Sequence, residues 1–125
     1  MAKFYRCNHC GNLFSVLHDG KVTPVCCGEN MQLLEANTTD AAVEKHVPVV
    51  RLERDGHVIR VNVGEADHPM VDEHYIEWIA YEADDRLEVH YLAQNDMPST
   101  FFAGASEHGT IYAYCNLHGL WKKEF

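Results

Sequence analysis

The chain has 125 residues, of which 46% are hydrophobic, and a formal net charge of -9. This length supports one modest hydrophobic core with a small appendage rather than two large domains. Asp and Glu number 19 against 10 Lys and Arg, which disfavours nucleic-acid binding, because that function needs a basic face. The acidic balance instead favours solubility and docking to a partner of complementary charge.

The sequence gives two indications of cellular compartment. No apolar run approaches the length that spans a bilayer, and the opening "MAKFYRCNHC" carries charge and cysteine where an export signal needs an apolar stretch. We therefore expect a cytoplasmic protein, in which clustered thiols hold metal more often than they form disulfides. The odd count of five cysteines would also leave one thiol over in an all-disulfide protein.

Residues 1–35 are predicted to form a small unit of short strands, such as "KFYR" and "LFSVL". This segment has too little apolar surface to fold by burial alone, so we expect a metal to stabilise it. The pair Cys7 and Cys10, in a C-x-x-C motif, and the adjacent pair Cys26 and Cys27 supply four thiols. Four thiolates at a tetrahedral centre suit either zinc or iron.

The adjacent cysteines need a special backbone. Neighbouring residues in a strand point to opposite faces, so Cys26 and Cys27 reach one ion only if the chain bends between them, as Gly28 permits. We expect a distorted tetrahedron. Two disulfides and a purely structural zinc site are the alternatives, and His9 and His18 are expected to be exposed because four thiols already fill the site.

Residues 36–45, "ANTTDAAVEK", are small and polar and are interpreted as a linker. From His46 onward the pattern is β, with an Asp55-Gly56 hairpin signal. About seven short strands at this spacing predict an all-β sandwich. The expected strands cover 47–54, 57–63, 75–83, 86–93, 100–105, 110–115 and 119–125.

The fifth cysteine, Cys115, is followed by His118 in "AYCNLHGLW". His46, His68 and His74 lie near strand ends, in loops that a sandwich can gather at one end. A structural zinc site closes at four ligands, so this larger set indicates another metal. A blue-copper site is the alternative, but it expects a methionine soon after the histidine and leaves two histidines without a role.

The other histidines of this region are expected to have no ligand role. His57 and His90 lie inside strand patterns and are interpreted as exposed strand residues, and His108 as a turn residue. Trp78 and Trp121 are expected to pack the core, since large aromatic side chains bury much area.

Taken together, these motifs resemble the desulfoferrodoxin family, the two-domain form of superoxide reductase. "CNHCG", "VCCGENM", "EKHVPV", "HPM", "HYIEWI" and "YCNLHGLW" correspond to the family in order, kind and approximate spacing, over essentially the whole chain. The resemblance implies a desulforedoxin-like domain at 1–35 with one tetrathiolate iron. It implies a linker at 36–45 and an immunoglobulin-like seven-stranded sandwich domain at 46–125.

The resemblance also implies a second iron, which is square-pyramidal and catalytic. Its ligands map onto four equatorial imidazoles and one axial thiolate: His46, His68, His74, His118 and Cys115. Glu44 maps onto a glutamate that fills the sixth position in the ferric state, and Lys45 onto a catalytic lysine. The implied reaction is the one-electron reduction of superoxide to hydrogen peroxide, which detoxifies superoxide in an anaerobe or microaerophile.

The implied cofactors are two iron ions per chain, with zinc able to replace iron at the tetrathiolate site. The implied partners are rubredoxin or a similar electron donor and a second copy of the chain in a homodimer, with no nucleic acid and no membrane. Two other functions are weighed against this one: an electron-transfer iron protein without superoxide turnover, and a cupredoxin-like copper protein.

Overall fold

The computed structural model describes residues 1–103 and 106–125, and it divides into two compact units, Met1–Glu35 and Ala36–Phe125. Within the described residues, strands and turns dominate and the helical content is a single short turn, so the predicted all-β class is confirmed. No helix among these residues is long and apolar enough to cross a bilayer. Gly104 and Ala105, at the end of the predicted strand 100–105, lie outside the described residues.

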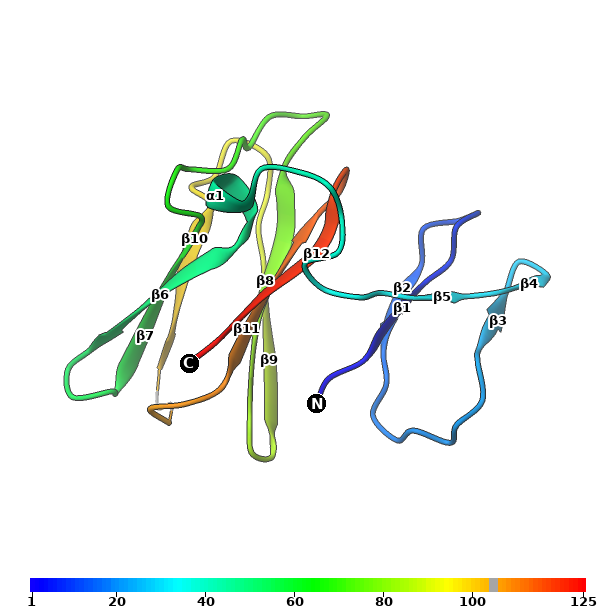
Figure 1. The fold of residues 1–125 in the computed structure, drawn as a ribbon, viewed down its shortest axis with the longest axis horizontal. Helices are drawn as coiled ribbons and strands as arrows, with labels where there is room; N and C mark the ends of the chain where they lie inside the picture. Colours follow the sequence, from blue (N-terminus) through cyan, green and yellow to red (C-terminus); the bar gives the residue numbers. More distant parts are fainter. Residues whose placement is uncertain (104–105) are drawn as a thin grey trace. The chain divides into compact units, whose positions relative to one another are not determined.

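The smaller unit consists of two short antiparallel sheets (Figure 1). One has the order β2-β1-β5 and the other pairs β3 with β4. Their bounds are Phe4–Arg6 (β1), Leu13–Ser15 (β2), Val25–Cys26 (β3), Glu29–Asn30 (β4) and Gln32–Leu33 (β5). Phe4, Cys7 and Met31 are its buried hydrophobic residues. So small a core rarely holds a fold by itself, which leaves a structural role for the four cysteines.

The larger unit is a β-sandwich, as the sequence predicted. Its described residues form a sheet of order β10-β7-β6 and a sheet of order β12-β11-β8-β9, each antiparallel (Figure 1). The seven strands are Pro48–Glu53 (β6), Val58–Val63 (β7), Ile76–Ala83 (β8), Arg86–Tyr91 (β9), Ser99–Ala103 (β10), Thr110–Cys115 (β11) and Gly119–Glu124 (β12).

Alternation along the strands builds the core between the two sheets. Ile59 and Val61 of β7 belong to the same buried cluster as Ile111 and Ala113 of β11. Burial of each large aliphatic side chain contributes about 1.5–3 kcal/mol. On β10, Phe102 is fully buried whereas its neighbour Phe101 is 52% exposed, because successive side chains of a strand point to opposite faces.

One end of the sandwich gathers the segments that matter for function. The chain after β7, the chain before β8 and the β11–β12 turn lie at the same end as a short helix, α1 (Figure 1). The opposite end is closed by tight turns, in which Asp55 and Gly56 have positive φ values of 57° and 85°. Asp and Gly are residue types that tolerate this conformation.

Helix α1, Val43–His46, is a feature that the sequence did not predict. It occupies the last residues of the predicted linker and continues to His46. A single helical turn has no stability of its own in water, and the residue before it, Ala42, offers no side-chain cap. Neighbouring loops must therefore hold this turn in place.

Candidate metal centres

The first candidate centre lies in the smaller unit and contains the four predicted thiols. The sulfurs of Cys7, Cys10, Cys26 and Cys27 all lie within 4.8 Å of one another, and all four cysteines are free of disulfides. Cys27 and Gly28 have positive φ values of 53° and 77°. These two residues supply the bend that the adjacent pair required, and Cys27 itself takes part in it.

The electrostatics of this group favour a bound cation. The N–H of Cys10 donates to the sulfur of Cys7 and is the main cause that lowers the pKa of Cys7 to about 6. Hydrogen bonding to the Cys10 thiol raises the pKa of Cys27 to about 12. Neighbouring thiolates repel one another, so they cannot all ionise unaided. Four sulfurs at this spacing fit zinc or iron, because the metal supplies the missing positive charge.

The second candidate centre lies at the loop end of the sandwich and has a square of imidazoles. Neighbouring ring centroids are 4.7 Å (His46–His68), 4.6 Å (His68–His74), 5.1 Å (His74–His118) and 4.9 Å (His118–His46) apart, with interplanar angles between 76° and 87°. The diagonal His46–His74 separation is 6.4 Å. Four sides of similar length and a longer diagonal describe a nearly square ring.

One thiol joins this square. A ligand atom of Cys115 lies within 4.8 Å of ligand atoms of His46, His68 and His74, and its Sγ is 3.8 Å from Nδ1 of His118. Cys115 ends β11, where the pairing with β8 shifts register after Tyr114. It is fully buried, and burial raises its pKa. The N–H of His118 donates to its sulfur at 3.4 Å.

Hydrogen bonds fix which ring atoms face the centre. Nδ1 of His46 lies 2.7 Å from the carbonyl oxygen of Ala42, and Nδ1 of His68 lies 2.6 Å from that of Pro69. A carbonyl oxygen can only accept, so each Nδ1 carries the hydrogen and each Nε2 presents a lone pair. Such outer hydrogen bonds are typical of histidines that ligate metals.

The positions and protonation of the inward-facing ring nitrogens indicate whether a metal fits this site. Nε2 of His46 is 3.2 Å from Nε2 of His68 and 3.1 Å from Nδ1 of His118. Nε2 of His74 is buried and has no hydrogen-bond partner among the described residues. Burial lowers the pKa values of His46, His68 and His74, that of His68 to about 4. Neutral imidazoles with crowded lone pairs fit a cation bound among them.

Glu44 and Lys45 lie on α1, directly before His46, and both are exposed. Besides burial, which is the largest cause, the positive charge of Lys45 lowers the pKa values of His46 and His74. The charge of this exposed lysine therefore disfavours protonation of both histidines. The charge of Glu44 raises the pKa of His46 in the opposite sense.

The loop after β7 supports the α1 turn through backbone contacts. Sequence reasoning did not identify this support. The N–H of Ala66 donates to the carbonyl of Glu44 at 3.0 Å. A Cβ added at Gly64 would lie 2.7 Å from the Glu44 oxygen, 2.8 Å from the Val47 oxygen and 3.1 Å from the Lys45 carbonyl carbon. Gly64 thus lets two backbone segments approach more closely than any side chain allows.

Trp121 is buried, as expected for core packing, and it also supports two histidines. Its ring stacks on His46, with centroids 4.7 Å apart and an interplanar angle of 28°. Its indole N–H donates to the carbonyl of His118 at 3.1 Å. The sequence contained no local signal for this second role, since the stack joins β12 to α1 across the fold.

The remaining histidines lie outside both groups among the described residues. His9 pairs with Glu29 at 3.0 Å on the surface of the smaller unit. His90 is not a simple exposed strand residue, because it is hydrogen-bonded to Thr100 at 2.7 Å and stacks on Phe102. It therefore connects β9 to β10, which belong to different sheets.

Two family models match the chain. The model described as Desulfoferrodoxin matches residues 38–124, and the one described as Desulfoferrodoxin, N-terminal domain, matches residues 1–34. Among curated proteins, a desulfoferrodoxin homolog of Archaeoglobus fulgidus is 45% identical over 118 residues, which cover 94% of this chain and 93% of that protein. The desulfoferrodoxin of Nitratidesulfovibrio vulgaris is 43% identical over 122 residues, with coverages of 98% and 95%.

Solved structures give the same result. The crystal structure of the superoxide reductase from Treponema pallidum matches with a TM-score of 0.78 and 31% identity, over 98% of each chain. A superoxide reductase (neelaredoxin) from Archaeoglobus fulgidus matches with a TM-score of 0.52 and 31% identity, over 66% of this chain and 87% of that one.

Substitution of Gly64 by Ala should distort the turn that carries Glu44, Lys45 and His46. The new methyl group would meet backbone atoms, which cannot rotate away, so the free energy of unfolding should fall by about 1–3 kcal/mol. Metal uptake at the imidazole square should fall with it. Urea unfolding and metal titration measure the two effects.

Gly20→Ala is the matched control, because nothing lies within 4 Å of the added carbon there. Wild-type stability and metal uptake in Gly64→Ala would show that the close approach does not position the turn.

Proposed function

The chain belongs to the desulfoferrodoxin family, and on that premise we propose that it reduces superoxide: one superoxide, one electron and two protons give hydrogen peroxide. The observation that carries this proposal is the square of four imidazoles that converges with one buried thiol. Imidazole nitrogens suit iron, and the set exceeds the four ligands of a structural zinc site.

We assign the ligand roles accordingly. His46, His68, His74, His118 and Cys115 would hold one iron, and Cys7, Cys10, Cys26 and Cys27 would hold the other, where zinc can take its place. When bound in the ferrous state at the imidazole square, iron supplies the single electron that superoxide needs. In domain terms, residues 1–35 form the desulforedoxin-like domain, 36–45 the linker and 46–125 the catalytic sandwich.

Lys45 has the role of attracting the substrate. The net charge of -9 repels a small anion on average, so a local cation must reverse the field at the site. Lys45 is exposed, and its charge acts on His46 and His74. A lysine ammonium is a compact point charge with three donors, so it can also orient the water that delivers protons.

Glu44 has the complementary role. It precedes Lys45 on the same helical turn, and its backbone carbonyl is fixed by Ala66. Its carboxylate would be available as a ligand to iron in the ferric state, and in that role it would help hydrogen peroxide to leave. Because Glu44, Lys45 and His46 share one turn, a single segment presents carboxylate, cation and ligand together.

We also propose a cellular compartment, an electron donor and an oligomeric state for the protein. The five cysteines are free, which suits the reducing cytoplasm. Electrons would come from rubredoxin or a similar small carrier, and the chain would act as a homodimer. The smaller unit, with only a few buried hydrophobic residues, is a candidate for part of the dimer interface.

The direct test is stopped-flow mixing of the reduced, iron-loaded protein with superoxide, after metal analysis. We expect oxidation of the imidazole-bound iron at a near-diffusional rate and release of one hydrogen peroxide for each imidazole-bound iron. Slow oxidation without release of hydrogen peroxide would favour an electron-transfer protein without superoxide turnover. Copper in the purified protein would favour a cupredoxin-like site.

Lys45→Ala should lower the second-order rate with superoxide by about tenfold, the lower limit of typical electrostatic steering. Its rate should also depend less on ionic strength, because the screened attraction is gone. Stopped-flow rates over a salt series measure both effects, and Lys21→Ala, in the smaller unit, controls for the change in net charge. An unchanged rate at low salt would exclude Lys45 from the mechanism.

Glu44→Ala should leave the reaction of the ferrous protein nearly intact but shift the visible spectrum of the ferric protein. The reason is that the carboxylate acts on the oxidised state alone. Glu65→Ala, an exposed acid of the neighbouring loop, is the control. A ferric spectrum identical to that of the wild type would contradict carboxylate ligation.

A further inference from the structure

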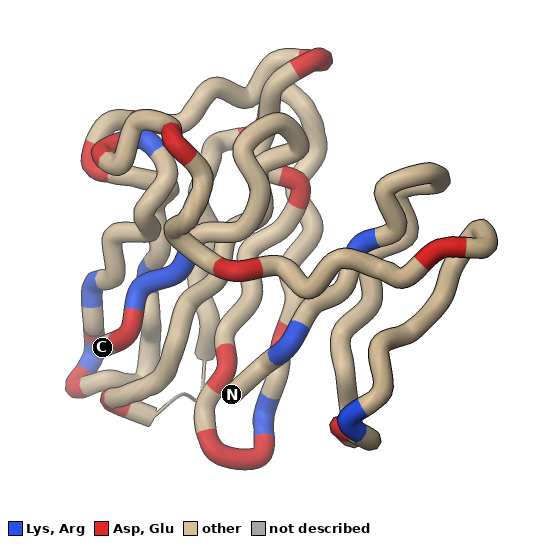
Figure 2. The backbone as a smooth tube through the Cα atoms, turned by 45° about the vertical axis from the view of Figure 1, so that its right-hand side comes forward, with Lys and Arg blue, Asp and Glu red and all other residues tan. Residues whose placement is uncertain are grey.

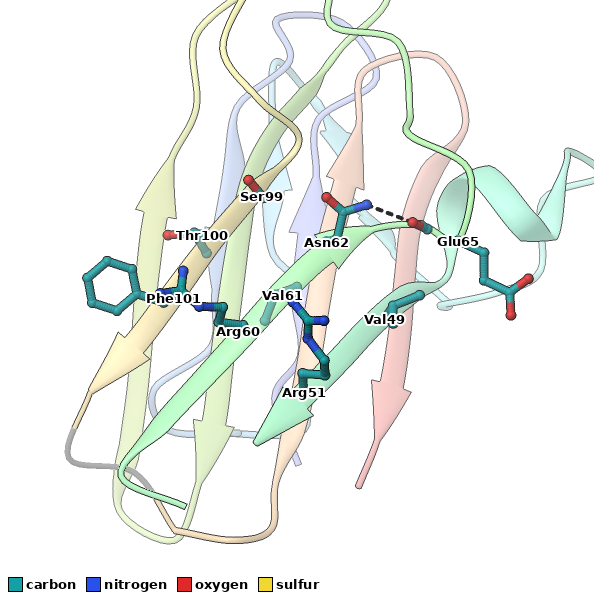
Figure 3. A pocket seen from close by; sticks show the side chains of 10 residues that line it. Val49, Arg51, Arg60, Val61, Asn62, Glu65, Ser99, Thr100 and Phe101 are labelled. Atoms are coloured by element: carbon teal, nitrogen blue, oxygen red, sulfur yellow. Dashed lines mark hydrogen bonds between the residues drawn. The ribbon is translucent and has the colours of Figure 1, made fainter. Parts of the chain in front are cut away.

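The outer face of the β10-β7-β6 sheet carries an open hollow of about 810 Å³ that the reaction above does not use (Figure 3). Rows of residues cross the three strands in register, so that Arg51 lies opposite Arg60, which lies opposite Phe101. Figure 3 shows both arginine side chains extending from this face, with Phe101 beside Arg60.

The two arginines are an unusual pair. Like charges directly opposite each other across strands are destabilising. Arg60 is compensated, since its Nε lies 2.9 Å from Glu53 and its guanidinium lies 5.7 Å from the Phe101 ring centre. Arg51 is exposed and forms no ion pair with any described residue. Although Glu65 also lines the hollow, Arg51 is a cation without an ion-pair partner among the described residues, in a chain whose net charge is -9.

A second hollow, of about 410 Å³, continues this surface to helix α1. The two hollows share Val49 and Glu65, and the second also includes Val43, Glu44, Val47 and Lys123. We call this combined surface the docking face. It exposes apolar anchors at Val43 (60%), Val49 (38%) and Phe101 (52%). Arginines and aromatic rings around apolar anchors are the composition of protein interfaces.

The docking face adjoins helix α1, the turn that carries Glu44, Lys45 and His46. Gly64 lines the first hollow and packs against the backbone of Glu44 and Lys45. The amide of Asn62, also in that hollow, donates to the carbonyl of Gly64 at 2.7 Å (Figure 3). A protein seated here would rest against the segment that carries His46.

We propose that the docking face binds a small acidic electron-carrier protein. This inference rests on the proposed function, in which each turnover spends one electron from outside. The reduced carrier loses one electron and the protein regains the one that went to superoxide, so the exchange balances.

Charge complementarity selects the acidic partner. Figure 2 shows Lys and Arg on neighbouring strands of the sandwich near the C-terminus, while Asp and Glu mark many turns and loops. An acidic carrier is repelled by most of the surface of this acidic protein. It is attracted to Arg51, which has no ion-pair partner among the described residues. A basic partner would instead favour the carboxylates elsewhere.

Arg51→Glu tests the proposal with rubredoxin as the probe. The variant should fold, because Arg51 is exposed and the new carboxylate faces Arg60. Reduction of the oxidised, iron-loaded variant by reduced rubredoxin should be at least about tenfold slower at low salt, with a flatter salt dependence. Phe101→Ser should also slow it, through loss of an anchor. Lys21→Glu, which makes the same charge change in the smaller unit, should leave the rate unchanged.

Three outcomes separate this inference from its alternatives. Reduction of Arg51→Glu at the wild-type rate at low salt would overturn it. Sedimentation that shows a wild-type dimer dissociated by Arg51→Glu would also overturn it, since the face would then belong to a second copy. The pre-reduced Arg51→Glu protein should still react with superoxide as the wild type does. If the pre-reduced wild type itself fails to react, the proposed function fails, and the docking result can be read independently.

Discussion

The crowding of unprotonated ligand atoms at the loop end of the sandwich is the constraint on which the rest of the site depends. Nε2 of His46 lies 3.1 Å from Nδ1 of His118 and 3.2 Å from Nε2 of His68, and burial disfavours protonation of His46 and His68. The facing lone pairs on Nε2 of His46 and Nε2 of His68 repel at this separation, and a cation bound between them turns that repulsion into attraction. The outer hydrogen bonds from His46 and His68 to backbone carbonyls keep the rings in this arrangement.

Much of this arrangement could be predicted from the sequence, for definite physical reasons. Alternation along segments such as 58–63 indicates strands, because a half-buried strand must place one face in the core. The spacing of Cys115 and His118 follows from a tight turn between two strands, and the structure pairs Cys115 with Gly119 across it. Such signals are local, so they survive in the sequence.

The features that escaped prediction arise from contacts between distant segments. A glycine is needed at position 64 because the backbone of the α1 turn packs directly against it. The sequence near residue 64 contains no signal that predicts this contact. The positive φ of Cys27 likewise follows from the need to aim two adjacent sulfurs at one point. His90 resembled an exposed strand residue, yet it bonds to Thr100 of the other sheet. Packing of this kind is decided by the fold as a whole.

The stack of Trp121 on His46 makes the protein its own optical probe. Indole emission is sensitive to a ring in face-to-face contact, and this indole also holds the backbone of His118. The other indole, Trp78, stacks on Tyr114 instead, with ring centres 5.6 Å apart. Filling or emptying of the imidazole square will therefore change the fluorescence of one tryptophan against the steadier background of the other, so occupancy can be followed without an added dye.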